Sequence, residues 1–235
     1  MYQIWDTRTR AMSATESKLQ AEAATVYQEF SLLDEMLVIF HSKDTTFCRV
    51  AGLTLLKARS LARGLFSLSL DGLAQESGAL LRSLIGCIEL MAYLRDNPQR
   101  VDEVLEERLP SAGEISKRIH GKFQKLRNYL NEHASHFSFA PESMPHLIDF
   151  KSGDWKVIQP YNEKVLRTNI TILFAVLVHL LDEAANCLSC NELLTDSLED
   201  RLNAFKEKGY TIFAKISENQ NKVKRIPIDK DSGRE

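Results

Sequence analysis

Cysteine is scarce in this chain, and the few cysteines are placed where they exclude most disulfide and metal chemistry. Of the four, Cys48 and Cys87 lie inside apolar helical patterns, where a free cysteine behaves as a small core residue. Cys187 and Cys190 have the spacing of half a metal clip, but no second Cys or His pair lies near them, and zinc needs four ligands or three and a water. No βαβ pattern surrounds the pair, as a thioredoxin-type motif requires. We therefore expect no metal, no cofactor and a reducing, cytoplasmic environment.

An excess of charge of either sign is also absent. The formal net charge of -2 excludes a protein covered in positive charge, although it allows a local basic surface. Arg8 and Arg10 are followed by polar residues rather than by an apolar segment, so we expect no signal peptide. The most apolar run, residues 170–181, is too short to span a bilayer and contains Thr171 and His179. It predicts a buried core helix and no membrane contact.

Sequence motifs that mark several enzyme classes are missing as well. The chain has no glycine-rich phosphate loop and no nucleophile elbow. The paired Glu-x-x-His motifs of di-iron bundles are absent too. His133 and His136 lie three residues apart, but no spaced carboxylate completes a metal site around them.

Apolar residues in three- and four-residue steps dominate the chain, and this period is typical of amphipathic helices. In the first pattern Ser13 and Glu16 have capping-box spacing, and Asp71-Gly72 and Asn97-Pro98 end the second and third. A short acidic helix is expected over residues 101–108. The long helices are expected over residues 13–40, 45–70, 73–94, 113–136, 163–189 and 191–217.

The helical period stops between residues 137 and 160. There Phe150, the turn signal Ser152-Gly153-Asp154 and Trp155 favour a small β-hairpin. We therefore expect an all-α, up-down bundle of about six helices with a β-hairpin insertion. It should form one domain over residues 1–217, followed by a polar, flexible tail over residues 218–235.

Residues able to do chemistry gather late in the predicted helix 113–136. Arg127 and Asn128 are followed by His133, which continues the apolar stripe of that helix. Six residues on an ideal helix separate Arg127 and His133 by about 120°, at roughly 100° per residue, so the two do not share a face. The other positions carry a basic surface made by Lys117, Arg118, Lys122, Lys125 and Arg127.

This arrangement of an Arg, a polar residue and a His near a helix end resembles the signature of the HEPN superfamily. The segment 78–94 is similar to uncharacterised helical families related to it, so the resemblance covers about the middle half of the chain. It implies metal-independent RNA cleavage by a homodimer in which two motif copies meet, with Arg127, His133 and Asn128 as the site residues. Members occur in toxins and phage-defence systems, which also implies an antitoxin or other protein partner.

The chemistry of the residues is compatible with that implication. A histidine with a near-neutral pKa can move the 2′-hydroxyl proton, and an arginine can hold the phosphate as charge develops. His133 would do the first and Arg127 the second, while Asn128 positions the arginine or a phosphate oxygen. Lys117, Arg118, Lys122 and Lys125 would follow the RNA backbone. The supporting residues would be Arg82, Glu89, Tyr129 and His136.

A structural interpretation of the same residues stays open at this point. His133 lies where the stripe favours an apolar residue, so its ring would be a core histidine bonded to Tyr129, Arg82 or Glu89. Arg127 would then flank the core with its stem, and the basic positions would be a solvated face. The chain would be a non-catalytic helical module that binds a partner protein.

Overall fold

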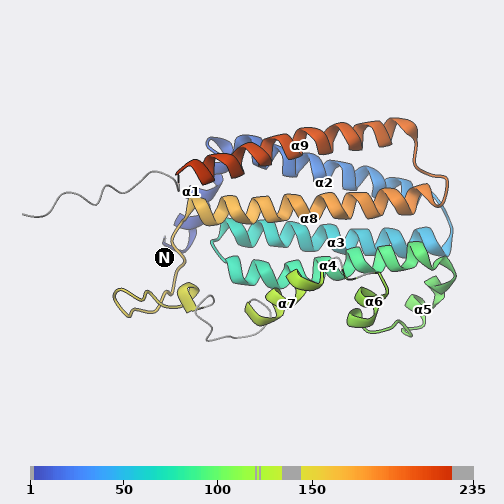
Figure 1. Ribbon diagram of the computed structural model, residues 1–235, viewed down its shortest axis with the longest axis horizontal. Coiled ribbons are helices and arrows are strands. Elements are labelled where there is room, and N and C mark those ends of the chain that lie inside the picture. The colour runs from blue at the N-terminus through green and yellow to red at the C-terminus, as the bar shows by residue number, and fades with distance from the viewer. Residues whose placement is uncertain (1–2, 120, 122, 134–143, 224–235) are drawn as a thin grey trace, which may run out of the picture.

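The computed structural model describes residues 3–119, 121, 123–133 and 144–223 (Figure 1). Over these ranges the regular elements are nine α-helices and two short 3-10 helices, η1 (Pro98–Arg100) and η2 (Met144–His146). The α-helices are α1 (Gln3–Glu16), α2 (Gln20–His41), α3 (Thr46–Leu70), α4 (Ala74–Asp96), α5 (Val101–Leu105), α6 (Ala112–Arg118), α7 (Gln124–His133), α8 (Glu163–Ser189) and α9 (Asp196–Val223).

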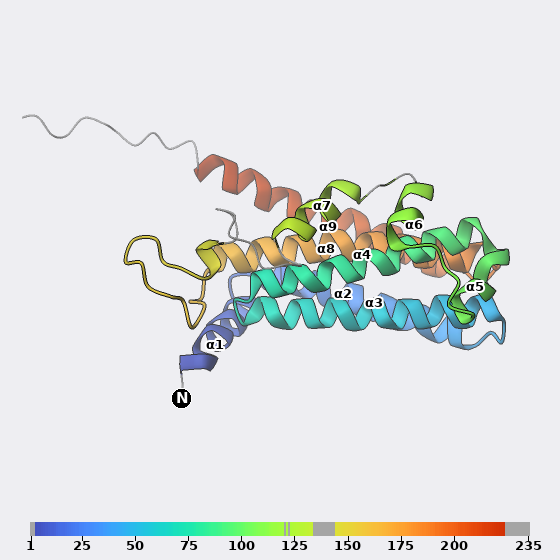
Figure 2. The ribbon, with the colours of Figure 1, turned by 90° about the horizontal axis from the view of Figure 1, so that it is seen from below.

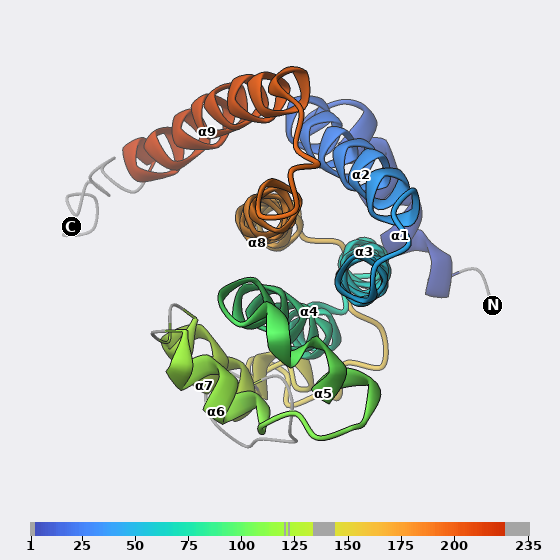
Figure 3. The same ribbon diagram turned by 90° about the vertical axis from the view of Figure 1, so that its right-hand side faces the viewer.

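The long helices form an elongated bundle around α8, which contacts α2, α3, α4 and α9. Seen from the end, α9 and α2 lie on one side of α8 and α3, and α4 lies on the other side (Figure 3). The short helices α6 and α7 pack on the outer side of α4 (Figure 2). The all-α class expected from the sequence is confirmed. The expected number of about six helices is corrected, because the described residues form nine α-helices, including a layer of short ones.

Helices α4 and α8 are the two most apolar candidates for membrane spans among the described residues. By length and composition alone, both α4 and α8 are long and apolar enough to cross a membrane. The run at residues 170–181 that the sequence singled out is only the middle part of α8. However, 56% of the most apolar window of α4 and 50% of that of α8 are buried inside the bundle. Such burial is what the core helices of a bundle require.

Local capping signals set the ends of the best-predicted helices. The Thr45 side chain accepts a hydrogen bond from the Cys48 N–H at 3.1 Å and starts α3. Asn162 accepts from the N–H groups of Lys164 and Val165 and starts α8. Gly72, with φ of +77°, makes the turn from α3 to α4 in a backbone region that favours glycine. Helices α3 and α8 therefore match their predicted ranges to within one residue.

Two predicted helices are each divided in the structure. The range 13–40 contains the end of α1 and all of α2, and Ser13 lies inside α1 rather than at its start. The range 113–136 contains α6 and α7, separated at Gly121, whose φ of +60° ends a helix. In both cases the apolar period continues through the bend, because Leu19 and Phe123 are buried beside it.

The predicted β-hairpin is also corrected. Among the described residues of 137–160 the only sheet-like pairing is one isolated antiparallel bridge between Ile148 and Trp155. Trp155 and Val157 are 83% and 92% exposed, so the alternating side chains bury no face that would extend a strand. The tail prediction is corrected in part, since α9 runs on to Val223. Residues 134–143 and 224–235 lie outside the described residues.

The packed face of α2 carries an unpaired carboxyl group. Glu29 is 0% exposed, and neither of its carboxyl oxygens has a hydrogen-bond partner among the described residues. Burial raises the pKa of Glu29 well above its ordinary value. Glu22, about two turns earlier on α2, is buried too, but Arg167 lies 3.8 Å from it. Glu29 is therefore a cost to the fold rather than a support.

We predict that Glu29→Met raises the free energy of unfolding at pH 7 by about 1–3 kcal/mol, because it removes a buried, unsatisfied polar group at similar volume. The folded protein holds the Glu29 proton more tightly than the unfolded chain, whose glutamates titrate near about pH 4.3. The destabilising effect of Glu29 is therefore smallest below that pH. It grows, and the free energy of unfolding falls, as the pH rises toward the higher folded-state pKa. Glu29→Met should abolish this decline in urea denaturation curves.

The matched control is Glu207→Met on α9, where the glutamate is exposed. It should change the free energy of unfolding by less than about 0.5 kcal/mol. A destabilised Glu29→Met protein would show that the carboxyl group has a favourable partner in the fold.

Candidate functional site

Arg127 lies on the packed side of α7 and forms an ion pair with Glu89 of α4. The contact joins Nη1 of Arg127 to Oε2 of Glu89, and the two residues are 6% and 1% exposed. The other carboxylate oxygen of Glu89 accepts a hydrogen bond from the Ser116 hydroxyl at 2.8 Å, and Ser116 of α6 is fully buried. Each oxygen of one buried carboxylate thus receives a donor from a different short helix.

This position corrects the expected direction of Arg127. The basic positions of the sequence placed it on an exposed surface, but the structure places it on the same side as Phe123 and Leu130, which are also buried. These residues recur at three- and four-residue steps and so share a helix face. An arginine is tolerated there because Glu89 compensates its charge.

The exposed side of α7 carries other residues of the motif. Asn128 is exposed and accepts a hydrogen bond from the Gln124 side chain at 2.8 Å. Lys125 is exposed, and Tyr129 is 52% exposed. The Nε of Arg82 donates to the side-chain oxygen of Asn131. His133 is the last residue of α7.

The basic surface predicted along this segment is found in part. Lys117 and Arg118 are exposed at the end of α6. The Arg118 guanidinium donates to the Tyr93 hydroxyl at 3.2 Å, and Arg100 donates to the same oxygen at 2.6 Å. Lys122 and His136, which the sequence also singled out, lie outside the described residues.

The burial of Arg127 limits what it can do chemically. A phosphate would have to compete with the Glu89 carboxylate for a guanidinium that solvent scarcely reaches. Separating a buried pair leaves an uncompensated charge, which costs about 3–5 kcal/mol. In this arrangement Arg127 positions α7, and the cations that meet solvent are those of the exposed side.

A cavity of about 550 Å³ lies beside α7, between α4 and α8. Leu126, Tyr129 and Leu130 of α7 line it, together with Asn169 of α8 and His146 of η2. Sequence reasoning missed this cavity because its walls come from segments far apart in the chain. The one local signal is the set of polar residues in the first turns of the apolar helix α8: Lys164, Thr168 and Asn169.

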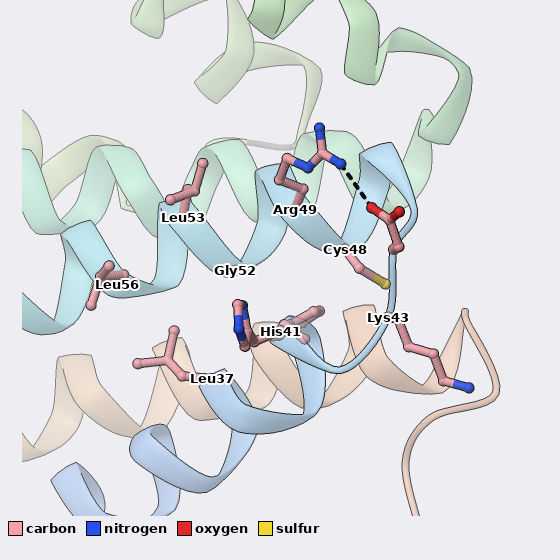
Figure 4. A pocket seen from close by; sticks show the side chains of 10 residues that line it. Leu37, His41, Lys43, Cys48, Arg49, Gly52, Leu53 and Leu56 are labelled. Carbon is pink, nitrogen blue, oxygen red and sulfur yellow. Dashed lines mark hydrogen bonds and ion pairs between the residues drawn. The ribbon is translucent and has the colours of Figure 1, made fainter.

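A second cavity, of about 540 Å³, lies where α2 turns into α3 (Figure 4). Leu37 and His41 of α2 line it, and Leu53 and Leu56 of α3 line its other side. The ion pair between Arg49 and Asp44, 2.8 Å long, lies at its rim. Apolar surface predominates in its walls, as it does in the cavity beside α7.

The cysteine pair noted in the sequence and the polar residues of α8 at positions 179 and 182 have separate surroundings. Burial raises the pKa of Cys187 to about 12, which keeps the thiol protonated, and Cys190 is exposed. His179 packs edge-on against Phe123, with ring centroids 5.3 Å apart. Asp182 accepts from Lys206 at 3.1 Å. Within the described part of the chain, no three His, Cys, Asp or Glu side chains are grouped so that they could hold a metal ion.

Comparison with known protein families, curated proteins and solved structures finds no match to this chain. Its function is therefore inferred from the chemistry of its own surfaces. Two of them adjoin α7: the exposed side of α6 and α7, and the cavity on the side of α8.

We predict that Arg127→Met lowers the free energy of unfolding by about 3–5 kcal/mol, because it leaves the buried Glu89 carboxylate without a counter-charge. The double variant Arg127→Met with Glu89→Leu should recover most of that loss, since apolar side chains can replace a buried ion pair. Urea denaturation of the single and double variants measures the coupling between the two side chains.

The matched control is Arg201→Met, which breaks the pair between Arg201 and Glu35 at 2.7 Å on the surface of α9 and α2. That pair is largely exposed, so its loss should cost at most about 1 kcal/mol. Additive effects of the two changes at 127 and 89 would contradict a structural role for the buried pair.

Proposed function

We propose that the chain is a HEPN-like RNA-binding protein that holds single-stranded RNA on one face, here named the α6–α7 face. This face consists of Lys117, Arg118, Lys125, Asn128 and Tyr129, all of them exposed. Lys125 and Tyr129 are four residues apart and therefore neighbours on the helix surface. Cations that follow phosphates and an aromatic ring on which a base stacks are the two elements of sequence-tolerant single-strand binding.

The observation that carries the proposal is the buried pair of Arg127 and Glu89. Because Arg127 is fixed against α4, the opposite side of α7 is held toward solvent with Lys125 and Tyr129 on it. Ser116 fixes α6 to the same carboxylate, so Lys117 and Arg118 keep their place beside α7. The motif arginine supports the face instead of touching the RNA.

The proposal extends to metal-independent cleavage, with His133 as the acid/base group. Arg127 and His133 lie about 120° apart on α7, at roughly 100° per residue, so the cation at the phosphate has to come from elsewhere. We propose a homodimer in which the α6–α7 face of a second copy supplies it. As in the family it resembles, such a protein would act in the cytoplasm, in a toxin or phage-defence system with an antitoxin partner.

A second candidate function is favoured by one observation at the other cavity. Leu53 and Leu56 are 60% and 48% exposed at its wall, and Leu37 on the neighbouring helix lines its other side. Exposed apolar side chains gathered at one groove are typical of protein interaction sites. In this alternative the chain is a non-catalytic helical module that binds a partner protein there.

We predict that fluorescently labelled single-stranded RNA binds the chain at low salt, with a log–log salt dependence of about -0.7 per phosphate contacted. Lys117→Glu with Lys125→Glu should weaken binding at least about tenfold for every sequence alike, because phosphate contacts carry no base information. Tyr129→Leu should weaken it by about 1–3 kcal/mol through lost stacking. Fluorescence anisotropy at several salt concentrations measures all three.

The control pair is Lys43→Glu with Lys208→Glu, which makes the same change in net charge at exposed positions away from the α6–α7 face. It should leave RNA affinity within about twofold of the parent. Equal weakening by both pairs, or no binding at low salt, would contradict the RNA-binding proposal and leave the protein-interaction module.

We predict that His133→Ala abolishes cleavage of end-labelled RNA in EDTA while RNA affinity changes little, because the group is assigned to proton transfer. Gel analysis of the cleavage products together with anisotropy separates the two effects. The control is His41→Ala, an exposed histidine at the far cavity. Cleavage that persists in His133→Ala would remove the acid/base assignment without touching RNA binding.

A further inference from the structure

The cavity between α4, α7 and α8 has the size and walls of a small-molecule site. Its volume of about 550 Å³ falls within the range of about 300–1,000 Å³ that is usual for ligand pockets. Four helices give it apolar walls through Leu65, Leu81, Leu126 and Ile172. Tyr129, half-exposed on the α6–α7 face, also lines it. The cavity is thus continuous with the face proposed to hold RNA.

An unsatisfied donor lies in the wall of the cavity. The side-chain nitrogen of Asn169 is buried and has no hydrogen-bond partner within the described part of the chain. A buried donor without an acceptor costs about 1–3 kcal/mol. A rotation of the Asn169 amide toward the cavity would let a carbonyl oxygen or a ring nitrogen of a ligand accept from this nitrogen and recover the energy. Every nucleobase carries such acceptors.

The charge of the cavity favours an anion. The described residues that line the cavity include Lys164 and do not include an aspartate or a glutamate. Ala74 and Gln75, the first residues of α4, line it as well. The N-terminus of α4 has no side-chain cap, because the residue before it is Leu73. The positive end of a 23-residue helix adds to the attraction that Lys164 exerts on a phosphate. Glu76 in the first turn of α4 opposes this attraction in part, but it is exposed and does not line the cavity.

We propose that this cavity binds one nucleotide, with the base between the apolar walls and hydrogen-bonded to Asn169, and with the phosphate near Lys164. The inference rests on the proposed function, since the nucleotide is taken to be one unit of the RNA strand on the α6–α7 face. A free nucleotide has the same chemistry, and competition with RNA separates the two sources.

The test is isothermal titration calorimetry of the full chain at low salt with the four ribonucleoside 5′-monophosphates, the parent nucleosides and inorganic phosphate. At least one nucleotide should bind with a Kd below about 1 mM, and its nucleoside about tenfold more weakly. Lys164→Gln should reduce nucleotide affinity to that of the nucleoside. Asn169→Leu should weaken both about tenfold or more while the thermal midpoint stays level or rises, because an unsatisfied amide is removed.

Matched controls separate the site from general effects. Asn186→Leu changes an exposed asparagine on the same helix, and Lys208→Gln changes an exposed lysine on α9. Neither should alter nucleotide affinity by more than about twofold. No nucleotide binding at about 1 mM, or an affinity unchanged by both Asn169→Leu and Lys164→Gln, would overturn the inference.

Competition then identifies the source and keeps the two proposals apart. If single-stranded RNA displaces the nucleotide and Asn169→Leu weakens RNA binding, the strand supplies the nucleotide. If nucleotide binds but RNA does not displace it, the cavity serves a free nucleotide. RNA binding without any nucleotide binding would overturn the cavity inference and leave the α6–α7 face intact. Nucleotide binding in a chain that binds no RNA would overturn the RNA-binding role of the α6–α7 face and leave the cavity as a site for a free nucleotide.

Discussion

The carboxylate of Glu89 is the point on which the outer layer of the molecule depends. It lies at the centre of α4, and it receives the Ser116 hydroxyl from α6 and the Arg127 guanidinium from α7. Helices of seven and ten residues are too short to be stable by themselves in water. The bend at Gly121 lies between α6 and α7. Ser116 therefore holds the segment before the bend to Glu89, and Arg127 holds the segment after it. The exposed Lys117, Arg118, Lys125 and Tyr129 lie on the two helices that this buried contact holds against α4.

The described residues include two other buried glutamates, Glu22 and Glu29, and the contrast between Glu89 and Glu29 is informative. Glu89 has a partner at each oxygen, whereas Glu29 has none among the described residues. The first is a charge compensated within the fold, and burial of the second raises its pKa well above its ordinary value. Removing the Glu89 carboxyl group alone should therefore lower the free energy of unfolding, and removing that of Glu29 should raise it. Both groups lie on the inner sides of long helices.

The sequence predicted those elements whose ends are set by neighbouring residues. Thr45 and Asn162 cap α3 and α8 directly, so these helices were located to within one residue. Prediction failed at residues 17–19 and near Gly121, because the apolar period runs through a bend when both sides of the bend are buried. A glycine inside an otherwise helical pattern was the available signal at the second position. The hairpin was wrong because its alternating residues bury nothing.

The candidate site was harder to predict than the fold. Arg127 belongs to a run of basic residues, and local spacing does not distinguish a cation that pairs with an acid 38 positions away from one that faces solvent. Its neighbours Phe123 and Leu130 did place it close to the packed side of the helix. The cavity beside α7 could not be predicted, since Leu65, Leu126 and Asn169 come together only when three helices pack.

The buried pair also bears on how such a chain can change during evolution. A mutation at position 89 or 127 alone strands a charge inside the protein, so homologues should retain both residues or replace both. Ser116, a neutral donor, is under a weaker restriction of the same kind. The arginine at position 127 would then be inherited for its part in folding, whatever reaction or partner a homologue has. Its presence in a related chain would indicate that α7 packs on α4 and would say little about activity.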